Sequence, residues 1–264
     1  MQAVLSRDGT SIVYDRIGKG RPVILVDGAL CHRAFGPSGP LAALLAKDYT
    51  VFTYDRRGRG ASGDTAPYAV AREVDDIAAL IDQAGGAAFV YGISSGAALA
   101  LEAAQGGLAI TKLALYEAPF IVDDTNPPLP GDYVVQLDSL IAAGRRGDAV
   151  AMFMKTVGVP AIFRSLMRLM PAWSKLKAVA HTLPYDMTIV ADNQRGKPLP
   201  VNRWASVTVP TLVVAGGKSP PWMQNGMRAL GAVLPNSTWC SLQGQTHMVK
   251  AKALAPVLTE FFAS

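Results

Sequence analysis

Gly92-Ile93-Ser94-Ser95-Gly96, a G-x-S-x-G pentapeptide, decides the fold because it stands between two structural signals. The apolar run 87–91 before it predicts a buried strand, and the segment 97–104 after it is rich in strong helix formers. A strand-to-helix turn this tight strains the central serine and leaves room only for small residues beside it. These signals favour a nucleophile elbow over an ordinary Gly-rich turn, and they make Ser94 the candidate nucleophile.

The composition predicts one α/β domain with a large core. Half of the 264 residues are hydrophobic, and no apolar run approaches the roughly 20 residues of a membrane-spanning helix. The first residues do not resemble a signal peptide. Two cysteines, Cys31 and Cys240, are too few for a disulfide framework and lack metal-ligand spacing. We therefore expect a soluble cytoplasmic protein.

The net charge of +5 predicts no special partner. The densest basic group, residues 56–59, lies in a Gly-rich turn, and nucleic-acid binding would require a basic stripe with interleaved aromatic residues. We interpret these charges as a solvated surface, and we find no basic cluster placed to bind a substrate carboxylate or phosphate. We expect a small-molecule substrate as the partner and no binding to nucleic acid or to a membrane. We expect the protein to be a monomer or a homodimer.

Strand and helix signals alternate in two parts of the chain, 1–119 and 206–264. Asp8-Gly9 marks a hairpin turn, and the apolar run 22–26 is typical of a parallel strand covered on both faces. This order predicts a mostly parallel, doubly wound sheet of eight strands. We interpret 120–205, where helical patterns replace the alternation, as an inserted helical cap.

The cap carries apolar and thioether side chains that would form an adaptable pocket or the core of the cap itself. A neutral, hydrophobic substrate fits such a pocket best. The side chains are those of Met152, Phe153, Met154, Phe163, Met167, Met170 and Trp173.

A serine nucleophile needs a general base, which is nearly always a histidine. Of the three histidines, His247 follows the last expected strand and precedes the last helix, on a Gly-containing loop at the carboxyl edge of the sheet. Its imidazole can reach Ser94 from there, so His247 is the candidate base. We expect His32 to be structural or pocket-lining, and His181 to be a cap or surface residue.

The acid that orients the base is found by exclusion. In the commonest version of this architecture it follows the strand before the histidine strand, but that loop, 216–221, has no acid, and none occurs between residues 192 and 260. Glu117 directly follows the strand after the nucleophile helix, where a buried charge needs a partner such as His247. Glu117 is the candidate acid, unless it forms a structural salt bridge. The alternative acids are Asp123 and Asp124.

Backbone N–H groups must also bind the oxyanion of an acyl-transfer reaction. Ser95, which follows the nucleophile, supplies one. Gly28 allows a sharp turn after the third strand, so the Ala29 amide is expected to be the second, although the turn can also simply end the strand. The residues expected to contact substrate are Gly28, Leu30, Met154 and Trp173.

Together these segments resemble the α/β-hydrolase superfamily over nearly the whole chain. The Asp27-Gly28 turn, the loop 54–62, the elbow and the loop 244–247 occur in the order of that family, and so do the nucleophile, acid and histidine. The resemblance implies an α/β-hydrolase fold with a cap. It also implies that the loop 54–62 shapes the sheet edge instead of doing chemistry.

The sequence differs from the usual pattern of this superfamily at two points, and these differences narrow the choice of branch. Asp27-Gly28 stands where the family usually has His-Gly, and the acid follows the sixth strand. The second arrangement is similar to that of haloalkane dehalogenases and, distantly, of zearalenone-type lactonases. The dehalogenase and epoxide-hydrolase branches use an aspartate nucleophile, which disfavours both for a chain with Ser94.

The sequence favours a cofactor-free serine hydrolase of the carboxylesterase or lactonase type. Its substrate would be a neutral hydrophobic ester or lactone, cleaved through an acyl-enzyme on Ser94. C–C bond hydrolysis of a vinylogous diketone and acyl transfer remain alternatives, because both use the same three residues. A non-catalytic ligand sensor on the same fold is the third alternative.

Overall fold

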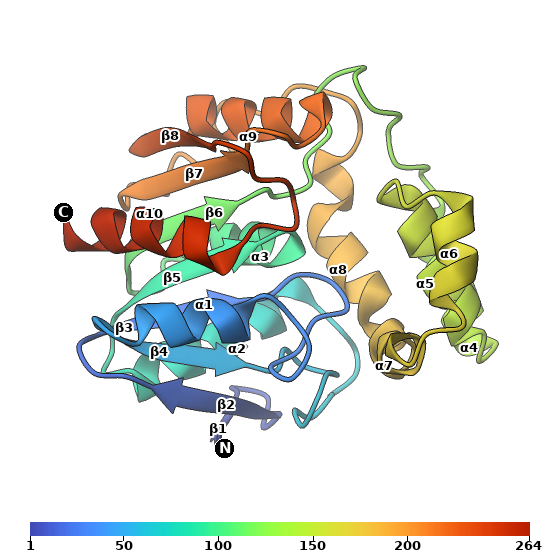
Figure 1. Cartoon of the computed structure of the whole chain (residues 1–264). Helices are drawn as coiled ribbons and strands as arrows, with labels where there is room; N and C mark the ends of the chain where they lie inside the picture. The colour runs from blue at the N-terminus through green and yellow to red at the C-terminus, as the bar shows by residue number, and fades with distance from the viewer.

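The computed structural model describes residues 1–264, and its centre is an eight-stranded sheet. The strand order is β1-β2-β4-β3-β5-β6-β7-β8, in which β2 is antiparallel to both of its neighbours, β1 and β4, and all other neighbouring pairs are parallel (Figure 1). The predicted mostly parallel sheet is therefore confirmed. The strands are β1 (Gln2–Leu5), β2 (Ser11–Ile17), β3 (Arg21–Val26), β4 (Tyr49–Tyr54), β5 (Ala88–Ile93), β6 (Ile110–Tyr116), β7 (Thr211–Gly216) and β8 (Ser237–Leu242).

Helices cover both faces of the sheet, as the continuous apolar strands require. Along β3, Val23 and Leu25 pack on the face covered by α1 and α10, whereas Ile24 and Val26 pack on the face covered by α2, α3 and α9. The alternation follows from the two-residue period of a strand. The covering helices are α1 (Ser38–Leu45), α2 (Val70–Gln83), α3 (Ser95–Gln105), α9 (Pro221–Val233) and α10 (Ala251–Ala263).

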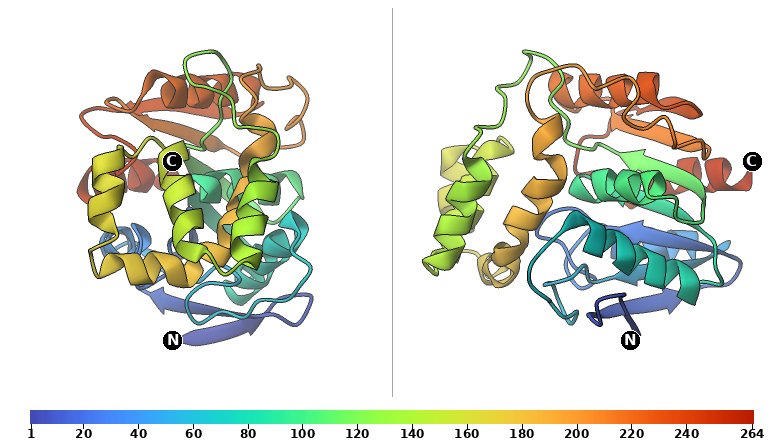
Figure 2. Two further views of the ribbon diagram at one scale, coloured as in Figure 1. Left: turned by 90° about the vertical axis from the view of Figure 1, so that its right-hand side faces the viewer. Right: turned by 180° about the vertical axis from the view of Figure 1, so that it is seen from behind.

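The chain between β6 and β7 forms a helical insertion at one side of the sheet (Figures 1 and 2). In Figure 1 and in the right-hand view of Figure 2, α8 lies between the sheet and the other inserted helices, and it packs against α2 and α3 as well as against α4 and α5. The insertion contains α4 (Tyr133–Ala142), α5 (Arg146–Thr156), α6 (Ala161–Met167), α7 (Ala172–Val179) and α8 (Leu183–Val190), with 3₁₀ turns at Ala180–Thr182 and Ala191–Asn193.

The sequence did not predict α7 and α8. Each has only eight residues, about two turns, which is too short for a helical period to stand out. Pro184 near the start of α8 also gives a turn signal, although the first turn of a helix tolerates proline.

None of the helices has both the length and the apolar character that are needed to span a lipid bilayer.

The interpretation of the basic group 56–59 as a solvated surface is wrong. Arg56, Arg57 and Arg59 each expose only 1% of their surface. Each guanidinium lies 2.7 Å from a buried carboxylate, and those carboxylates are contributed by α2 and α8. An arginine stays charged when buried, so it requires such partners. The partners are far away in sequence, and for this reason the composition gave no sign of them. They are Glu73 for Arg56, Asp76 for Arg57 and Asp186 for Arg59.

Replacing Gly92 by alanine should destabilise the protein by about 1–3 kcal/mol, the usual cost of overpacking. A Cβ at position 92 would lie 2.4 Å from the Gly96 carbonyl oxygen, against backbone that cannot give way. Gly39→Ala is the matched control, because a Cβ there meets nothing nearer than 4.0 Å and alanine favours helix α1. Urea unfolding measures both variants. A Gly92→Ala protein as stable as Gly39→Ala would contradict the packing described.

Candidate active site

The only three non-glycine residues with a positive φ lie at one edge of the sheet. They are Leu30 (φ 61°), Ser94 (φ 58°) and Glu117 (φ 48°), and they follow the adjacent strands β3, β5 and β6. This region of backbone conformation disfavours side chains, and such strain of order 1–3 kcal/mol per residue concentrates at functional sites. The carboxyl edge of the sheet is therefore the candidate active site.

Ser94 forms the turn between β5 and α3 with φ 58° and ψ −130°. Its backbone N–H donates to the Tyr116 carbonyl at 2.9 Å, which ties the turn to the end of β6. A Cβ at Gly96 would lie 2.3 Å from the Val26 carbonyl oxygen, so this glycine lets α3 approach β3 closely. The strand, strained serine and helix expected from the sequence thus occur in that order, and the Ser94 side chain stays partly exposed.

Glu117 and His247 meet at this edge. His247 Nδ1 lies 2.8 Å from Glu117 Oε2, and the other carboxylate oxygen accepts the Gly216 N–H at 2.6 Å. Glu117 is fully buried, whereas the His247 side chain is 35% exposed. A carboxylate on Nδ1 holds the imidazole in the tautomer that leaves Nε2 free to accept a proton. The pair thus has the arrangement of an acid and a general base.

The end of β7 and the loop after it, which lacks an acid, support this pair with their backbone. Besides the Gly216 N–H on Glu117, the Lys218 N–H donates to the Gln245 carbonyl at 2.8 Å. A Cβ at Gly216 would lie 2.6 Å from that same carbonyl oxygen. The glycine therefore lets the histidine loop pack closely beside β7, and the carboxylate reaches it from β6.

The alternative acids lie elsewhere. Asp123 accepts hydrogen bonds from the Thr125 hydroxyl, from the Thr125 backbone N–H at 3.0 Å and from the Asn225 amide at 2.8 Å. The bond from the Thr125 hydroxyl is the main cause that lowers the pKa of Asp123. Asp124 is exposed. Neither is hydrogen-bonded or ion-paired to a histidine. Of the three candidate acids, the structure brings only Glu117 to His247.

Neither of the other two histidines is hydrogen-bonded or ion-paired to Ser94 or Glu117. His32 pairs through its backbone with Phe35, at 3.0 and 2.8 Å. His181 Nε2 is 4.0 Å from an Asp64 oxygen, and burial followed by the nearby Arg146 lowers the pKa of this imidazole.

The turn after β3 and the start of α3 each have one N–H group without an acceptor in the chain. A Cβ at Gly28 would lie 2.8 Å from the Ser94 Cβ, so only glycine fits there. The backbone N–H groups of Ala29 and Ser95 donate to no acceptor within the chain. Leu30, the next residue, is buried in the core. One N–H of the turn and one at the start of α3 thus remain available as hydrogen-bond donors.

Asp27 is buried at the start of this turn. Its Oδ1 accepts a hydrogen bond from the Ser38 hydroxyl at 2.7 Å, which fastens the turn to the first residue of α1. Burial raises the pKa of Asp27 to about 6, against the opposing effects of that hydrogen bond and of the Arg59 and Arg56 charges. The carboxyl group that replaces the usual histidine is therefore costly to ionise.

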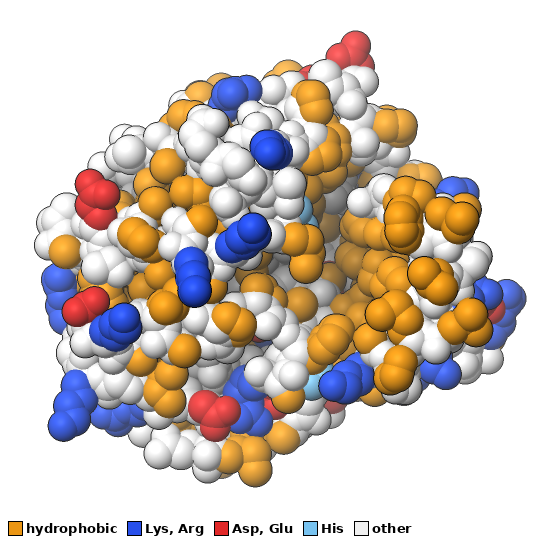
Figure 3. Space-filling model, in the orientation of Figure 1, with side chains coloured by type: hydrophobic (Ala, Val, Ile, Leu, Met, Phe, Trp, Pro, Cys, Tyr) orange, Lys and Arg blue, Asp and Glu red, His pale blue; other side chains and the backbone are white.

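Figure 3 shows a hollow, bordered largely by hydrophobic side chains, between the main body of the molecule and the outer helices of the insertion. Met154, predicted to contact substrate, is partly buried and packs against the main core cluster. Helix α6 has no buried residue, and Phe163 and Met170 are about half exposed. The insertion therefore presents apolar side chains to solvent as well as to its own core.

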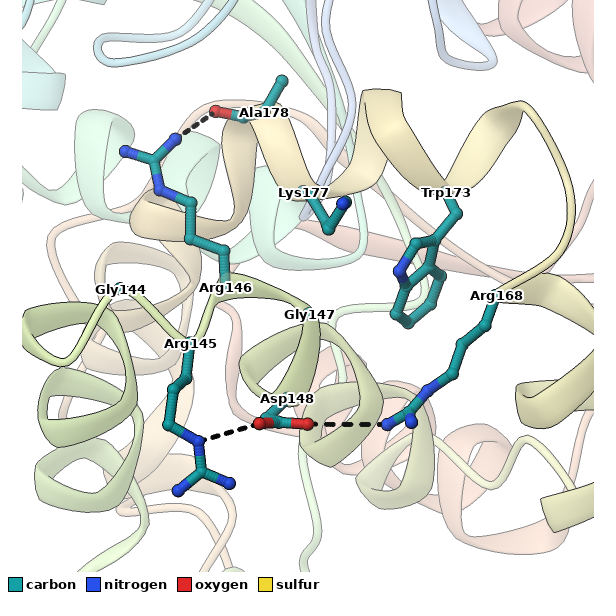
Figure 4. Close-up of a pocket in the computed structure, with 9 residues that line it drawn as sticks. All are labelled: Gly144, Arg145, Arg146, Gly147, Asp148, Arg168, Trp173, Lys177 and Ala178. Atoms are coloured by element: carbon teal, nitrogen blue, oxygen red, sulfur yellow. Dashed lines mark hydrogen bonds and ion pairs between the residues drawn. The ribbon is translucent and has the colours of Figure 1, made fainter.

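The fold gathers cations from three segments of the insertion into a cluster that the sequence did not indicate, away from the three candidate catalytic residues. Figure 4 shows a depression of about 570 Å³, in which only Asp148 balances the positive charge by pairing with Arg145 and Arg168. Trp173, predicted to contact substrate, lines this depression, whereas Ser94, Glu117 and His247 do not. The other lining residues are Gly144, Arg146, Gly147, Lys177 and Ala178.

Comparisons with known proteins agree with this architecture. Residues 23–249 match the model of the alpha/beta hydrolase family. A crystal structure of an alpha/beta hydrolase from Sphaerobacter thermophilus is 53% identical, with a TM-score of 0.91 and coverage of 99% of this chain and 100% of the other. The chain therefore belongs to the alpha/beta hydrolase family, and the predicted fold and superfamily are confirmed.

More distant structures share the fold alone. A hydrolase from Pseudomonas aeruginosa is 21% identical with a TM-score of 0.75, covering 100% of this chain and 98% of the other. The enol-lactonase from Burkholderia xenovorans is 19% identical with a TM-score of 0.71, and both chains are covered completely. A comparison with curated protein sequences gave no significant match.

Asp27→Asn should remove a pH dependence from the stability. Because the folded-state pKa of about 6 exceeds the ordinary 3.8, the folded protein binds more protons in this window, and the wild type loses stability as the pH rises through it. The free energy of unfolding of the variant, relative to wild type, should rise by about 2–3 kcal/mol as the pH rises from 3.8 to about 6, and then level off. The asparagine oxygen can still accept the Ser38 hydrogen bond.

Urea unfolding from pH 3.5 to 8 measures the difference in unfolding free energy between variant and wild type, in which the contributions of all other groups cancel. A change of about 1 kcal/mol in this difference can be resolved. A difference that stays flat across the range would contradict a buried, destabilised carboxyl at position 27.

Proposed function

We propose that this protein is a serine hydrolase that cleaves neutral, hydrophobic carboxylic esters or lactones. The observation that carries the proposal is the distance of 2.8 Å between His247 Nδ1 and Glu117 Oε2, beside a serine held in the left-handed conformation. Membership of the alpha/beta hydrolase family supports hydrolysis as the reaction class.

In the proposed reaction Ser94 Oγ attacks the carbonyl carbon while His247 Nε2 takes the hydroxyl proton. Glu117 stays ionised and stabilises the imidazolium. The N–H groups of Ala29 and Ser95 bind the oxyanion, and His247 returns the proton to the leaving alcohol. Water then attacks the acyl-enzyme while one of its protons passes to His247. His247 gives this proton to Ser94 Oγ as the carboxylic acid leaves, which regenerates the free serine.

The hydrophobic hollow supports an apolar substrate, since burying hydrocarbon contributes about 25 cal/mol per Å². The helical insertion would act as a cap over that substrate. Gly28, Leu30 and Met154 are proposed to contact the substrate. The cytoplasmic location, the absence of nucleic-acid and membrane partners, and a monomeric or dimeric state stay predictions.

Ser94→Ala should abolish labelling by a fluorophosphonate probe and turnover of p-nitrophenyl butyrate, because it removes the attacking oxygen. Wild type should label and turn over, and mass spectrometry should place the adduct on Ser94. A folded wild type that neither labels nor turns over would contradict the hydrolase function and favour a ligand sensor. A panel with an added alcohol acceptor and a vinylogous diketone separates ester hydrolysis from acyl transfer and C–C cleavage.

Glu117→Gln should lower kcat by roughly two to four orders of magnitude while the fold stays intact, because a neutral amide cannot stabilise the imidazolium. Asp123→Asn is the control and should keep kcat within about threefold of wild type. Steady-state hydrolysis measures both, and circular dichroism checks the fold. If Asp123→Asn were the more damaging change, the acid would be misassigned.

A further inference from the structure

The carboxylate of Asp186 reaches from the helical insertion into the base of the candidate active site. It lies on α8 and is 1% exposed. Its Oδ1 accepts hydrogen bonds from Arg56 and from the Ser95 hydroxyl, and its Oδ2 accepts one from Arg59, each at 2.7 Å. Burial alone would raise the pKa of Asp186, but the Arg59 and Arg56 charges outweigh it and lower the pKa. Asp186 is therefore ionised and fully bonded.

The same two arginines hold the turn after β3. Arg59 Nη1 donates to the Gly28 carbonyl at 2.7 Å, and Arg56 Nη1 donates to the Asp27 carbonyl at 3.2 Å. The Gly28 carbonyl shares a peptide group with the Ala29 N–H, one of the two proposed oxyanion donors, and the Asp27 carbonyl lies one peptide group earlier. Arg56 is further fixed by Glu73 of α2, through two hydrogen bonds of 2.7 Å.

The second proposed donor, the Ser95 N–H, belongs to the residue whose hydroxyl bonds Asp186 directly. One carboxylate thus connects to both donors, to Ser95 by one hydrogen bond and to Ala29 through the two arginines. Stabilisation of an oxyanion depends on donors held in place before the reaction, and a displacement of about 1 Å can cost about 100-fold in rate.

We propose that Asp186 is a positioning residue that holds the two oxyanion donors in register and makes their geometry depend on the helical insertion. It touches no substrate atom and acts through Ser95, Arg56 and Arg59. Since α8 packs against both the sheet helices and the rest of the insertion, a shift of α8 would be transmitted to the oxyanion site.

The test compares Asp186→Asn with Asp76→Asn. Asp76 forms an equally buried pair with Arg57 of the same loop, at 2.7 Å, but Arg57 bonds no carbonyl of the turn after β3. With p-nitrophenyl butyrate, Asp186→Asn should lower kcat at least about tenfold with KM within about threefold. Asp76→Asn should keep kcat within about threefold, whatever its effect on the Tm.

Ser95→Ala removes only the hydrogen bond from the Ser95 hydroxyl to Asp186 and keeps the Ser95 backbone N–H. This variant therefore tests the positioning role even if Asp186→Asn does not fold. It should lower kcat about three- to tenfold with little change in KM. Equal kcat for wild type and Ser95→Ala, or equal losses in Asp186→Asn and Asp76→Asn, would overturn the positioning role.

The proposal rests on the proposed serine-hydrolase function, and hydrogen–deuterium exchange separates the two. Exchange in the peptide 27–36 should be at least about tenfold faster in Asp186→Asn than in Asp76→Asn, because the arginines lose their anchor. An inactive wild type that still shows this difference would refute the hydrolase function alone. An active wild type with equal exchange in both variants would refute the positioning role alone.

Discussion

The left-handed backbone at Ser94 is the constraint on which the candidate site depends. A residue with a side chain adopts this conformation only when its surroundings hold it there. The Tyr116 carbonyl fixes the Ser94 N–H, and glycines at positions 92 and 96 let β5, α3 and β3 come together closely. The packing of the whole sheet offsets the energetic cost of this strained conformation.

The same sheet determines where the proposed acid and base meet. β6 is the neighbour of β5 and β7, so a residue after β6 stands between the elbow and the histidine loop. Glu117 takes this position, and the N–H of Gly216, the last residue of β7, donates a hydrogen bond to it. Burial of a carboxylate is costly, and here the imidazole and the Gly216 N–H offset that cost.

A second layer of buried charge lies beneath the turn after β3. Arg56 and Arg59 share the Asp186 carboxylate and also bind backbone carbonyls of that turn. Buried ion pairs of this kind add little net stability, because desolvation cancels most of the attraction, but removing one member is severe. Their arrangement is better explained by the geometry they impose than by the stability they provide.

The sequence by itself determined the sheet, the elbow and the three proposed catalytic residues. Local periodicity and turn residues specify these features, and the absence of acids between residues 192 and 260 pointed to Glu117. Only the tertiary structure decided three further features. They are the burial of the arginines at 56–59, the basic depression in the insertion, and the hydrogen bonds of Asp186 to Ser95, Arg56 and Arg59. Each of these joins residues from distant segments, and the desolvation that pairs them exists only after the chain has folded.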